Sequence, residues 1–202
     1  MTKSLLPRVI VVDSNFIISY ITKKDTTSDD RARMDCFIED VENAKSKIIF
    51  PMIAISEFLV RAENAGLAIL DELEKKACIL VANFDRAAAQ ELAKMERNAL
   101  NAGDKRAGSE EPYQKIKVDR QIVAIGLAHG AKMIISRDNA VRNEATRLGL
   151  FAARIQDLEL PQSARQLTLV APLPTGRRTN FRRPVLATAP AAVQPTASQK
   201  PD

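Results

Sequence analysis

The feature that most constrains the fold is a series of short apolar runs that alternate with helical patterns. The first run, 8–12, reads Arg-Val-Ile-Val-Val and ends at Asp13. Further apolar runs lie at 47–50, 77–81, 132–136 and 150–153. Uninterrupted apolar runs of this length are typical of strands buried on both faces, and strands that alternate with helices favour a parallel sheet. We therefore expect an α/β fold, a three-layer α/β/α sandwich with a mostly parallel central sheet.

The segments between these runs carry helix start and stop signals. Asp85 is placed as an N-cap before a periodic segment, and Gly66 is placed as a C-cap after one. The helices that we expect span 14–21, from the turn cluster 26–30 to 41, 53–65, 67–76, 86–100, 118–129 and 139–148. Residues 101–112, with Gly103 and Gly108, have the composition of a loop.

The net charge of +5 is unevenly distributed along the 202 residues. Residues 1–160 hold 24 basic and 24 acidic side chains, so the whole excess falls in residues 161–202. This segment is rich in Pro, Ala, Thr and Arg, and it cannot bury enough apolar surface to offset the entropy of ordering it. We expect one folded domain, 1–160, followed by a disordered Pro/Ala/Arg-rich tail, 161–202.

Composition excludes several classes of protein. Aromatic residues make up 4% of the chain and Trp is absent, which argues against binding single strands mainly by base stacking. The apolar segment near the start is broken by Pro7 and Arg8, so it has neither the h-region of a signal sequence nor the length of a membrane span. The two cysteines lie outside any metal-binding or disulfide pattern. We expect a cytoplasmic protein with no membrane partner.

Four acidic residues, each close to an apolar stretch, are the candidate functional residues: Asp13, Glu57, Asp119 and Asp138. Asp13 and Asp138 directly follow expected strands, where ligands of parallel sheets bind. Glu57 and Asp119 are expected in the first turns of helices, where the helix dipole tolerates negative charge. Isolated buried carboxylates are costly and normally appear only when they are paired or hold a metal.

If the four carboxylates converge, their mutual repulsion demands a divalent cation. Ligands that are all oxygen favour Mg²⁺ or Mn²⁺ over Zn²⁺, and the single His129 cannot build a zinc site alone. A metal held by carboxylates can activate water and stabilise an in-line phosphoryl displacement. Hydrolysis of phosphodiesters is therefore the reaction that the pattern favours.

The order of these acids resembles that of the PIN-domain nucleases, most closely the bacterial VapC-like toxin ribonucleases of toxin–antitoxin pairs. The matching segments, over about residues 8–155, are Asp13-Ser14-Asn15, Ser56-Glu57-Phe58, Asp119-Arg120-Gln121-Ile122-Val123-Ala124 and Ser136-Arg137-Asp138. The resemblance implies a ribonuclease in which the four acids surround Mg²⁺ or Mn²⁺ and in which Asn15 and Ser136 orient them. It also implies an antitoxin partner with a basic side chain that displaces the metal, and a homodimer.

Two features depart from the family pattern. Many members carry a further Asp two positions after the fourth acid, with an aromatic residue next to it, whereas this chain has Ala140 and Val141 there. The Pro-rich tail is unusual for a toxin of this type. The first departure leaves the number of metal ions open.

The resemblance to an RNA-cleaving enzyme requires basic side chains that hold phosphates, since these contacts supply most of the sequence-independent affinity. The candidates near the four motifs are Arg61, Lys117, Arg120, Arg137 and Arg142.

Other interpretations of the same residues remain. Asp13 and Asp138 could act only as helix caps, and Glu57 and Asp119 could be solvated surface acids. The same fold could also serve as a catalytically weak module that binds RNA or protein. A phosphatase or nucleotide-binding protein is the least favoured alternative, because the sequence has no glycine-rich phosphate loop and Asp13 lacks a second Asp two residues later.

Overall fold

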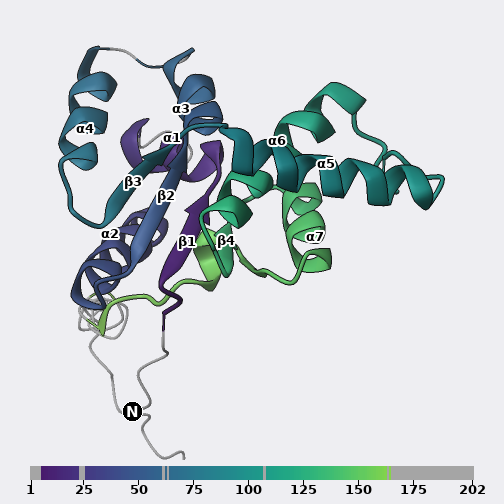
Figure 1. Ribbon diagram of the computed structural model, residues 1–202. Coiled ribbons are helices and arrows are strands. Elements are labelled where there is room, and N and C mark those ends of the chain that lie inside the picture. The colour runs from purple at the N-terminus through teal and green to yellow at the C-terminus, as the bar shows by residue number, and fades with distance from the viewer. Residues whose placement is uncertain are drawn as a thin grey trace, which may run out of the picture. The chain divides into compact units, whose positions relative to one another are not determined.

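The computed structural model describes residues 6–22, 26–60, 62, 64–106, 108–162 and 164. Within these residues the chain alternates strands and helices along its length, as Figure 1 shows. The elements are β1 (Val9–Val12), α1 (Ser14–Thr22), α2 (Ser28–Asn43), β2 (Lys47–Pro51), α3 (Met52–Leu59), α4 (Asn64–Glu74), β3 (Ile79–Ala82), α5 (Arg86–Asn101), α6 (Tyr113–Ala128), β4 (Met133–Ile135), α7 (Asn139–Arg147), β5 (Phe151–Ala153) and the 3-10 turn η1 (Ile155–Asp157).

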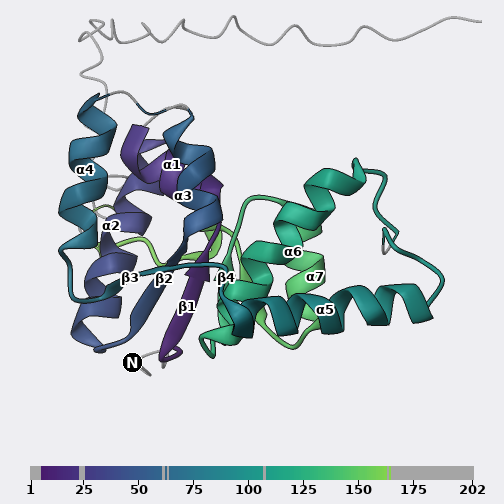
Figure 2. The same ribbon diagram turned by 45° about the horizontal axis from the view of Figure 1, so that its top comes forward.

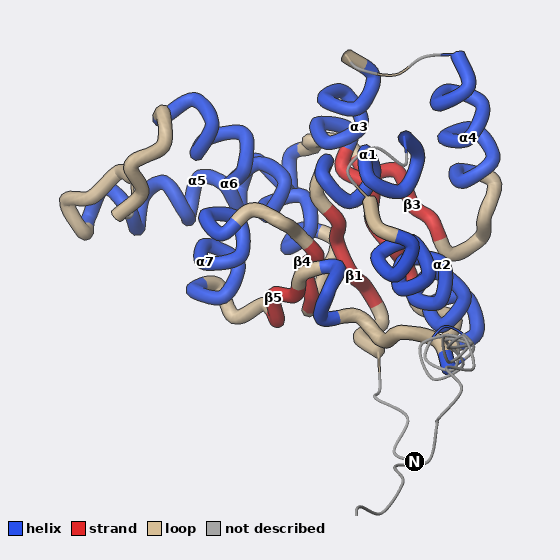
Figure 3. The backbone as a smooth tube through the Cα atoms, turned by 180° about the vertical axis from the view of Figure 1, so that it is seen from behind, coloured by secondary structure: helices blue, strands red, loops and turns tan. Residues whose placement is uncertain are grey.

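The strands form one five-stranded sheet in the order β3-β2-β1-β4-β5, and every neighbouring pair is parallel. Figures 1 and 2 show helices α1 to α4 on one side of the strands and α5 to α7 on the other. The view from behind in Figure 3 shows the same arrangement, with the strands between two groups of helices. The expected three-layer α/β/α sandwich with a parallel sheet is therefore confirmed.

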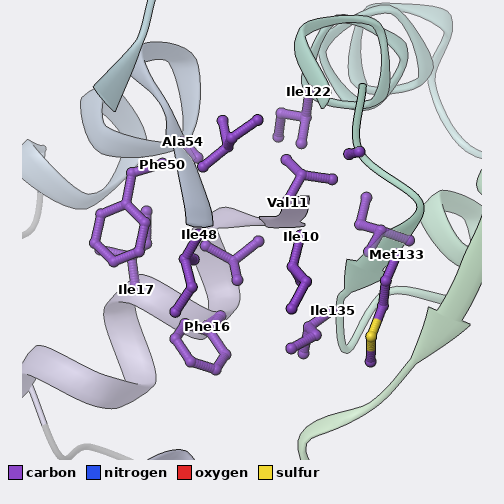
Figure 4. Packing of buried hydrophobic residues seen from close by; sticks show 14 of the residues in the cluster. Ile10, Val11, Phe16, Ile17, Ile48, Phe50, Ala54, Ile122, Met133 and Ile135 are labelled. Atoms are coloured by element: carbon purple, nitrogen blue, oxygen red, sulfur yellow. The ribbon is translucent and has the colours of Figure 1, made fainter. Parts of the chain in front are cut away.

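The core lies on both faces of β1, which is the central strand. Its residues alternate between the two helical layers: Ile10 lies on the side of Phe16 from α1, and Val11 lies on the side of Ile122 from α6 (Figure 4). All four side chains are buried. Because both faces are covered, the strand needs apolar residues at every position, which explains the unbroken β-branched run in the sequence.

Three helix boundaries differ from the sequence prediction. Helix α3 ends at Leu59, six residues before the expected end at 65, and α4 begins at Asn64 and not at 67. Gly66 does not end a helix; it lies in the first turn of α4, where a Cβ atom would stand 3.2 Å from Cζ of Phe58. The glycine therefore permits close packing between α3 and α4, a tertiary contact that the local pattern does not encode. Helix α6 begins at Tyr113, five residues before the expected start at Val118, because Pro112 stands at its N-cap position.

The N-cap predicted at Asp85 is confirmed, one residue of the turn cluster 26–30 is also a cap, and so is Asp138, as the alternative interpretation had it. Thr27 accepts the N–H of Asp30 at the start of α2, Asp85 accepts the N–H of Ala88 at the start of α5, and Asp138 caps α7. Each satisfies a backbone donor that a helix end leaves unpaired.

Within the part of the chain that the structure describes, no helix has the length and apolar character needed to cross a membrane. The predicted disordered tail, 161–202, lies outside the described residues except for positions 161, 162 and 164. The domain boundary near residue 160 therefore stays a prediction.

The close approach of α6 to β1 yields the first prediction. A Cβ atom at Gly126 would stand 2.7 Å from Cγ1 of Val11. We expect Gly126→Ala to lower the free energy of unfolding by about 1–3 kcal/mol, because overpacking of a tight core outweighs the gain of ~1 kcal/mol in helix propensity. Urea denaturation measures the change.

The control is the same substitution in a Val11→Ala background. Removing the two Val11 methyl groups opens the space that the new Cβ needs, so Gly126→Ala should cost less there. An equal cost in both backgrounds would show that the contact with Val11 does not explain the glycine.

Candidate active site

The strand order places two of the candidate acids at the same edge of the sheet. Strands β1 and β4 are neighbours, although β2 and β3 lie on the other side of β1, so the order reverses between them. Ligands of parallel sheets bind beyond the carboxyl ends of the strands at such a switch point. Asp13 directly follows β1 and Asp138 follows β4 by three residues. The sheet therefore brings these two acids together from positions 125 residues apart.

The carboxylate of Asp13 is held by hydrogen bonds from several directions. The side chain is 2% exposed; its Oδ1 accepts the N–H of Phe16 at 3.1 Å, and its Oδ2 accepts Nδ2 of Asn15 at 3.4 Å. Burial raises the pKa of Asp13, and hydrogen bonds from Ser136, Phe16 and Asn15 oppose that rise. Asp13 is thus both a cap for α1 and a fixed, buried oxygen donor.

Ser136 joins the two acids that follow the strands. Its hydroxyl donates a hydrogen bond to Oδ2 of Asp13 and accepts the N–H of Asp138 at 2.9 Å. Oδ1 of Asp138 in turn accepts the N–H of Ala140 at 2.7 Å. Ser136 and Asn15 thus both donate to Asp13, and the orienting role that the family resemblance implies for them stays a prediction.

The other three acids raise the pKa of Asp119. This residue lies within α6, and its Oδ2 is buried with no hydrogen-bond partner among the described residues. Burial raises the pKa of Asp119 to about 7, and so do the negative charges of Asp138, Glu57 and Asp13, against the opposing charge of Lys115. The charges of the three other predicted acids therefore all reach the Asp119 carboxylate.

The sequence predicted that Glu57 and Asp119 lie in the first turns of their helices, and this prediction was wrong. Glu57 is the sixth residue of α3 and is exposed, and Asp119 is the seventh residue of α6. The helix dipole therefore does little for either side chain, since its effect is confined to the end turns. Their placement follows from the packing of α3 against α6.

Lys115 lies beside the candidate acids, although it is not among the candidate site residues named from the sequence. Its Nζ lies 2.7 Å from Oδ2 of Asp138 and 3.1 Å from Oε1 of Glu111, and it stands one helical turn before Asp119. Burial acts to raise the pKa of Asp138, but the hydrogen bond and the charge of Lys115, together with the backbone N–H groups of Ala140 and Val141, outweigh it and lower that pKa. The spacing of four residues between Lys115 and Asp119 on one helix was the available signal.

The donor set suits a hard divalent cation. All four acids offer oxygen atoms, and the buried Oδ2 of Asp119 has no hydrogen-bond partner in the described part of the chain. Among the described residues, no three His, Cys, Asp or Glu side chains are grouped closely enough to hold a metal ion as they stand. Asp138 is bound to Lys115 instead, and carboxylates without a cation between them repel one another. The all-oxygen donor set is nevertheless of the kind that Mg²⁺ and Mn²⁺ prefer.

The basic residues predicted to contact phosphates differ in their surroundings. Lys117 is exposed on α6 and free to contact a phosphate. Arg137 pairs with Asp30 at 3.2 Å, and Nη1 of Arg142 donates to the carbonyl oxygen of Ser136 at 2.8 Å. Arg142 thus supports the loop that carries Asp138. Arg61 lies outside the described residues.

Arg120 is not placed as a phosphate contact. It is 1% exposed, its Nη1 pairs with Glu96 of α5 at 2.9 Å, and its Nε lies 3.5 Å from Glu144 of α7. The sequence shows only an arginine next to a candidate acid. Consecutive side chains of a helix point about 100° apart, and Arg120 is buried where α6 meets α5 and α7.

A cavity of about 180 Å³ adjoins Asp119. Its walls include Arg120, Ala140 and Asn143, and the loop after α5 contributes Arg106 and Ser109. The loop thus flanks the site. The position at which the family pattern has a further acid, Ala140, opens onto this space.

No family model matches the sequence, and no curated protein matches it. The structure, however, is similar to a chain of VapBC2 from Rickettsia felis, solved bound to a DNA fragment from their promoter, with a TM-score of 0.52, 11% identity, and coverage of 72% of this chain and 98% of that one. DNA-bound VapBC from Salmonella typhimurium aligns with a TM-score of 0.49, 16% identity, and coverage of 74% and 99%. The first similarity confirms a VapC-like PIN fold.

The raised pKa of Asp119 yields the second prediction. An unfolded Asp titrates near pH 4, whereas folded Asp119 titrates near pH 7, so the folded protein binds the extra proton between these values. Protonated Asp119 therefore contributes to the stability of the fold at low pH, and this contribution is lost as pH rises from about 4 to 7. We expect Asp119→Asn to raise Tm by roughly 3–8 °C at pH 8, because ~1 kcal/mol shifts Tm by several degrees.

The measurement is a melting curve in EDTA at pH 4.5 and pH 8 for both proteins. At pH 4.5 the two Tm values should be close, since Asp119 is then protonated and uncharged. A gap that does not grow with pH would contradict the assignment of this proton to Asp119.

Proposed function

We propose that this protein is a metal-dependent endoribonuclease that holds Mg²⁺ or Mn²⁺ with Asp13, Glu57, Asp119 and Asp138. The observation that carries the proposal is the Asp119 carboxylate, whose pKa is raised to about 7 by burial and by the three other acids. Such a concentration of negative charge is costly in a stable fold and is characteristic of functional sites. A divalent ion would relieve it.

The chain's own residues prepare the site for this chemistry. The bound metal would supply an activated water and charge stabilisation for an in-line attack on a phosphodiester. Asp13 is fixed by Ser136, Asn15 and the N–H of Phe16, so its oxygen atoms need little reorganisation to act as ligands. The α7 cap holds Asp138 in the same way.

We propose RNA as the substrate and the toxin half of a toxin–antitoxin pair as the biological role. The solved neighbours are VapBC complexes, which supports an antitoxin partner for this chain. Such a partner would silence the site by placing a basic side chain among the carboxylates. A homodimer and a cytoplasmic location belong to the same proposal.

A catalytically weak module that binds RNA or protein is the second candidate. It is favoured by Ala140, which stands where the family pattern has a further acid, and by the ion pair of Asp138 with Lys115. The two candidates differ in metal binding. Only the enzyme should show a Tm that rises with the concentration of Mn²⁺.

The third prediction tests catalysis. We expect the purified protein to cleave single-stranded RNA with Mg²⁺ or Mn²⁺, and Asp13→Asn to reduce cleavage to the level seen in excess chelator, because one ligand charge is lost. The amide keeps the size of the side chain, so the melting curve checks that the fold survives. Gel analysis of a labelled RNA follows the reaction.

The matched control is Asp71→Asn, which removes an exposed acid from α4. It changes the net charge equally and should leave cleavage unchanged. Full activity of Asp13→Asn, or of the wild type in EDTA, would refute the mechanism.

A further inference from the structure

The ammonium group of Lys115 stands among the carboxylates of the candidate site. It binds Asp138 and Glu111 at 2.7 and 3.1 Å, and its charge also acts on Asp119. It comes from the same helix as Asp119, one turn earlier, so the backbone holds it in place. The protein thus carries a monovalent cation of its own at the place where the proposed metal ion would bind.

We propose that Lys115 exchanges partners during function: it holds Asp138 while the site lacks metal, and it contacts a phosphate of the RNA once a divalent ion takes Asp138. This inference rests on the proposed function. It assigns to Lys115 both a competition with the metal and a contact with the substrate.

Competition follows from charge and geometry. Oδ2 of Asp138 is within hydrogen-bond distance of Lys115, while Oδ1 accepts the N–H of Ala140. A divalent ion on Asp138 would meet the ammonium at short range, and two cations at one carboxylate repel each other strongly where water is partly excluded. The lysine must therefore move when the metal binds.

Asp138 does not need Lys115 for its position. Its backbone N–H is bound by the Ser136 hydroxyl, and its side chain caps α7 through Ala140. Removing the lysine side chain should therefore leave the carboxylate in place and free for metal. A residue that merely positioned Asp138 would have the opposite effect on metal affinity.

A phosphate of the RNA is the new partner that we infer for the released ammonium group of Lys115. Lys115 is 40% exposed, so its flexible stem can turn without breaking the core. Once a metal holds Asp138, the other ion-pair partner of Lys115 among the described residues is Glu111, whose side chain is itself exposed. The incoming group is a phosphodiester, for which lysine is a suitable point-charge ligand.

The fourth prediction is that Lys115→Met strengthens metal binding and weakens substrate binding. We expect Mn²⁺ affinity, measured by calorimetry on the full chain without RNA, to rise roughly fivefold, the change expected for loss of a partly exposed ion pair. The KM for single-stranded RNA should rise several-fold. Lys115→Arg should stay near the wild type in both measurements, because it keeps the charge.

Lys117→Met is the matched control. Lys117 is exposed two residues further along α6, forms no ion pair with the described residues, and loses the same charge. It should leave Mn²⁺ affinity unchanged. A comparable rise in this control would mean that the effect is general electrostatics, which would overturn the assignment to Lys115.

The outcomes separate this inference from the proposed function. If the wild type binds Mn²⁺ and cleaves RNA, but Lys115→Met binds Mn²⁺ no more tightly, the inference fails and the nuclease proposal stands. An unchanged KM in Lys115→Met would contradict the proposed contact between Lys115 and an RNA phosphate. If neither protein binds Mn²⁺, both proposals fail together.

Discussion

The parallel pairing of β1 with β4 is the constraint on which the candidate site depends. It sets Val12 beside Ile135, and the N–H of Asp13 continues the ladder by donating to the carbonyl oxygen of Ile135 at 3.2 Å. The two strands therefore end at the same level, and the loops that leave them must meet. The hydroxyl of Ser136 fills the space between these loops and joins both acids. Without this register, the acids would be ordinary helix caps.

Much of this arrangement could be predicted from the sequence, because its causes are local. The unbroken apolar run at β1 indicates burial on both faces, and the acid after it marks the end of the strand. The caps at Thr27, Asp85 and Asp138 depend on residues within three positions of the helix start. The order of the four acids added a family resemblance, and the VapC-like fold agrees with it.

The remaining features depend on contacts that a linear pattern does not contain. Gly66 has the composition of a C-cap, but its role is set by the Phe58 ring in the preceding helix. Helix α6 begins earlier than predicted because Pro112 is compatible with a helix start as well as with a loop. Lys115 and Arg120 are both basic residues near Asp119, yet one faces the acids and the other is buried. Only the rotation of the helix distinguishes them.

That rotation is itself fixed by the buried arginine. Arg120 forms ion pairs with Glu96 from α5 and Glu144 from α7, so it links three helices. Because Asp119 is the adjacent residue, the angle at which its carboxylate projects depends on the acids that hold Arg120. The direction of a candidate metal ligand is thereby coupled to the docking of α5 on α6.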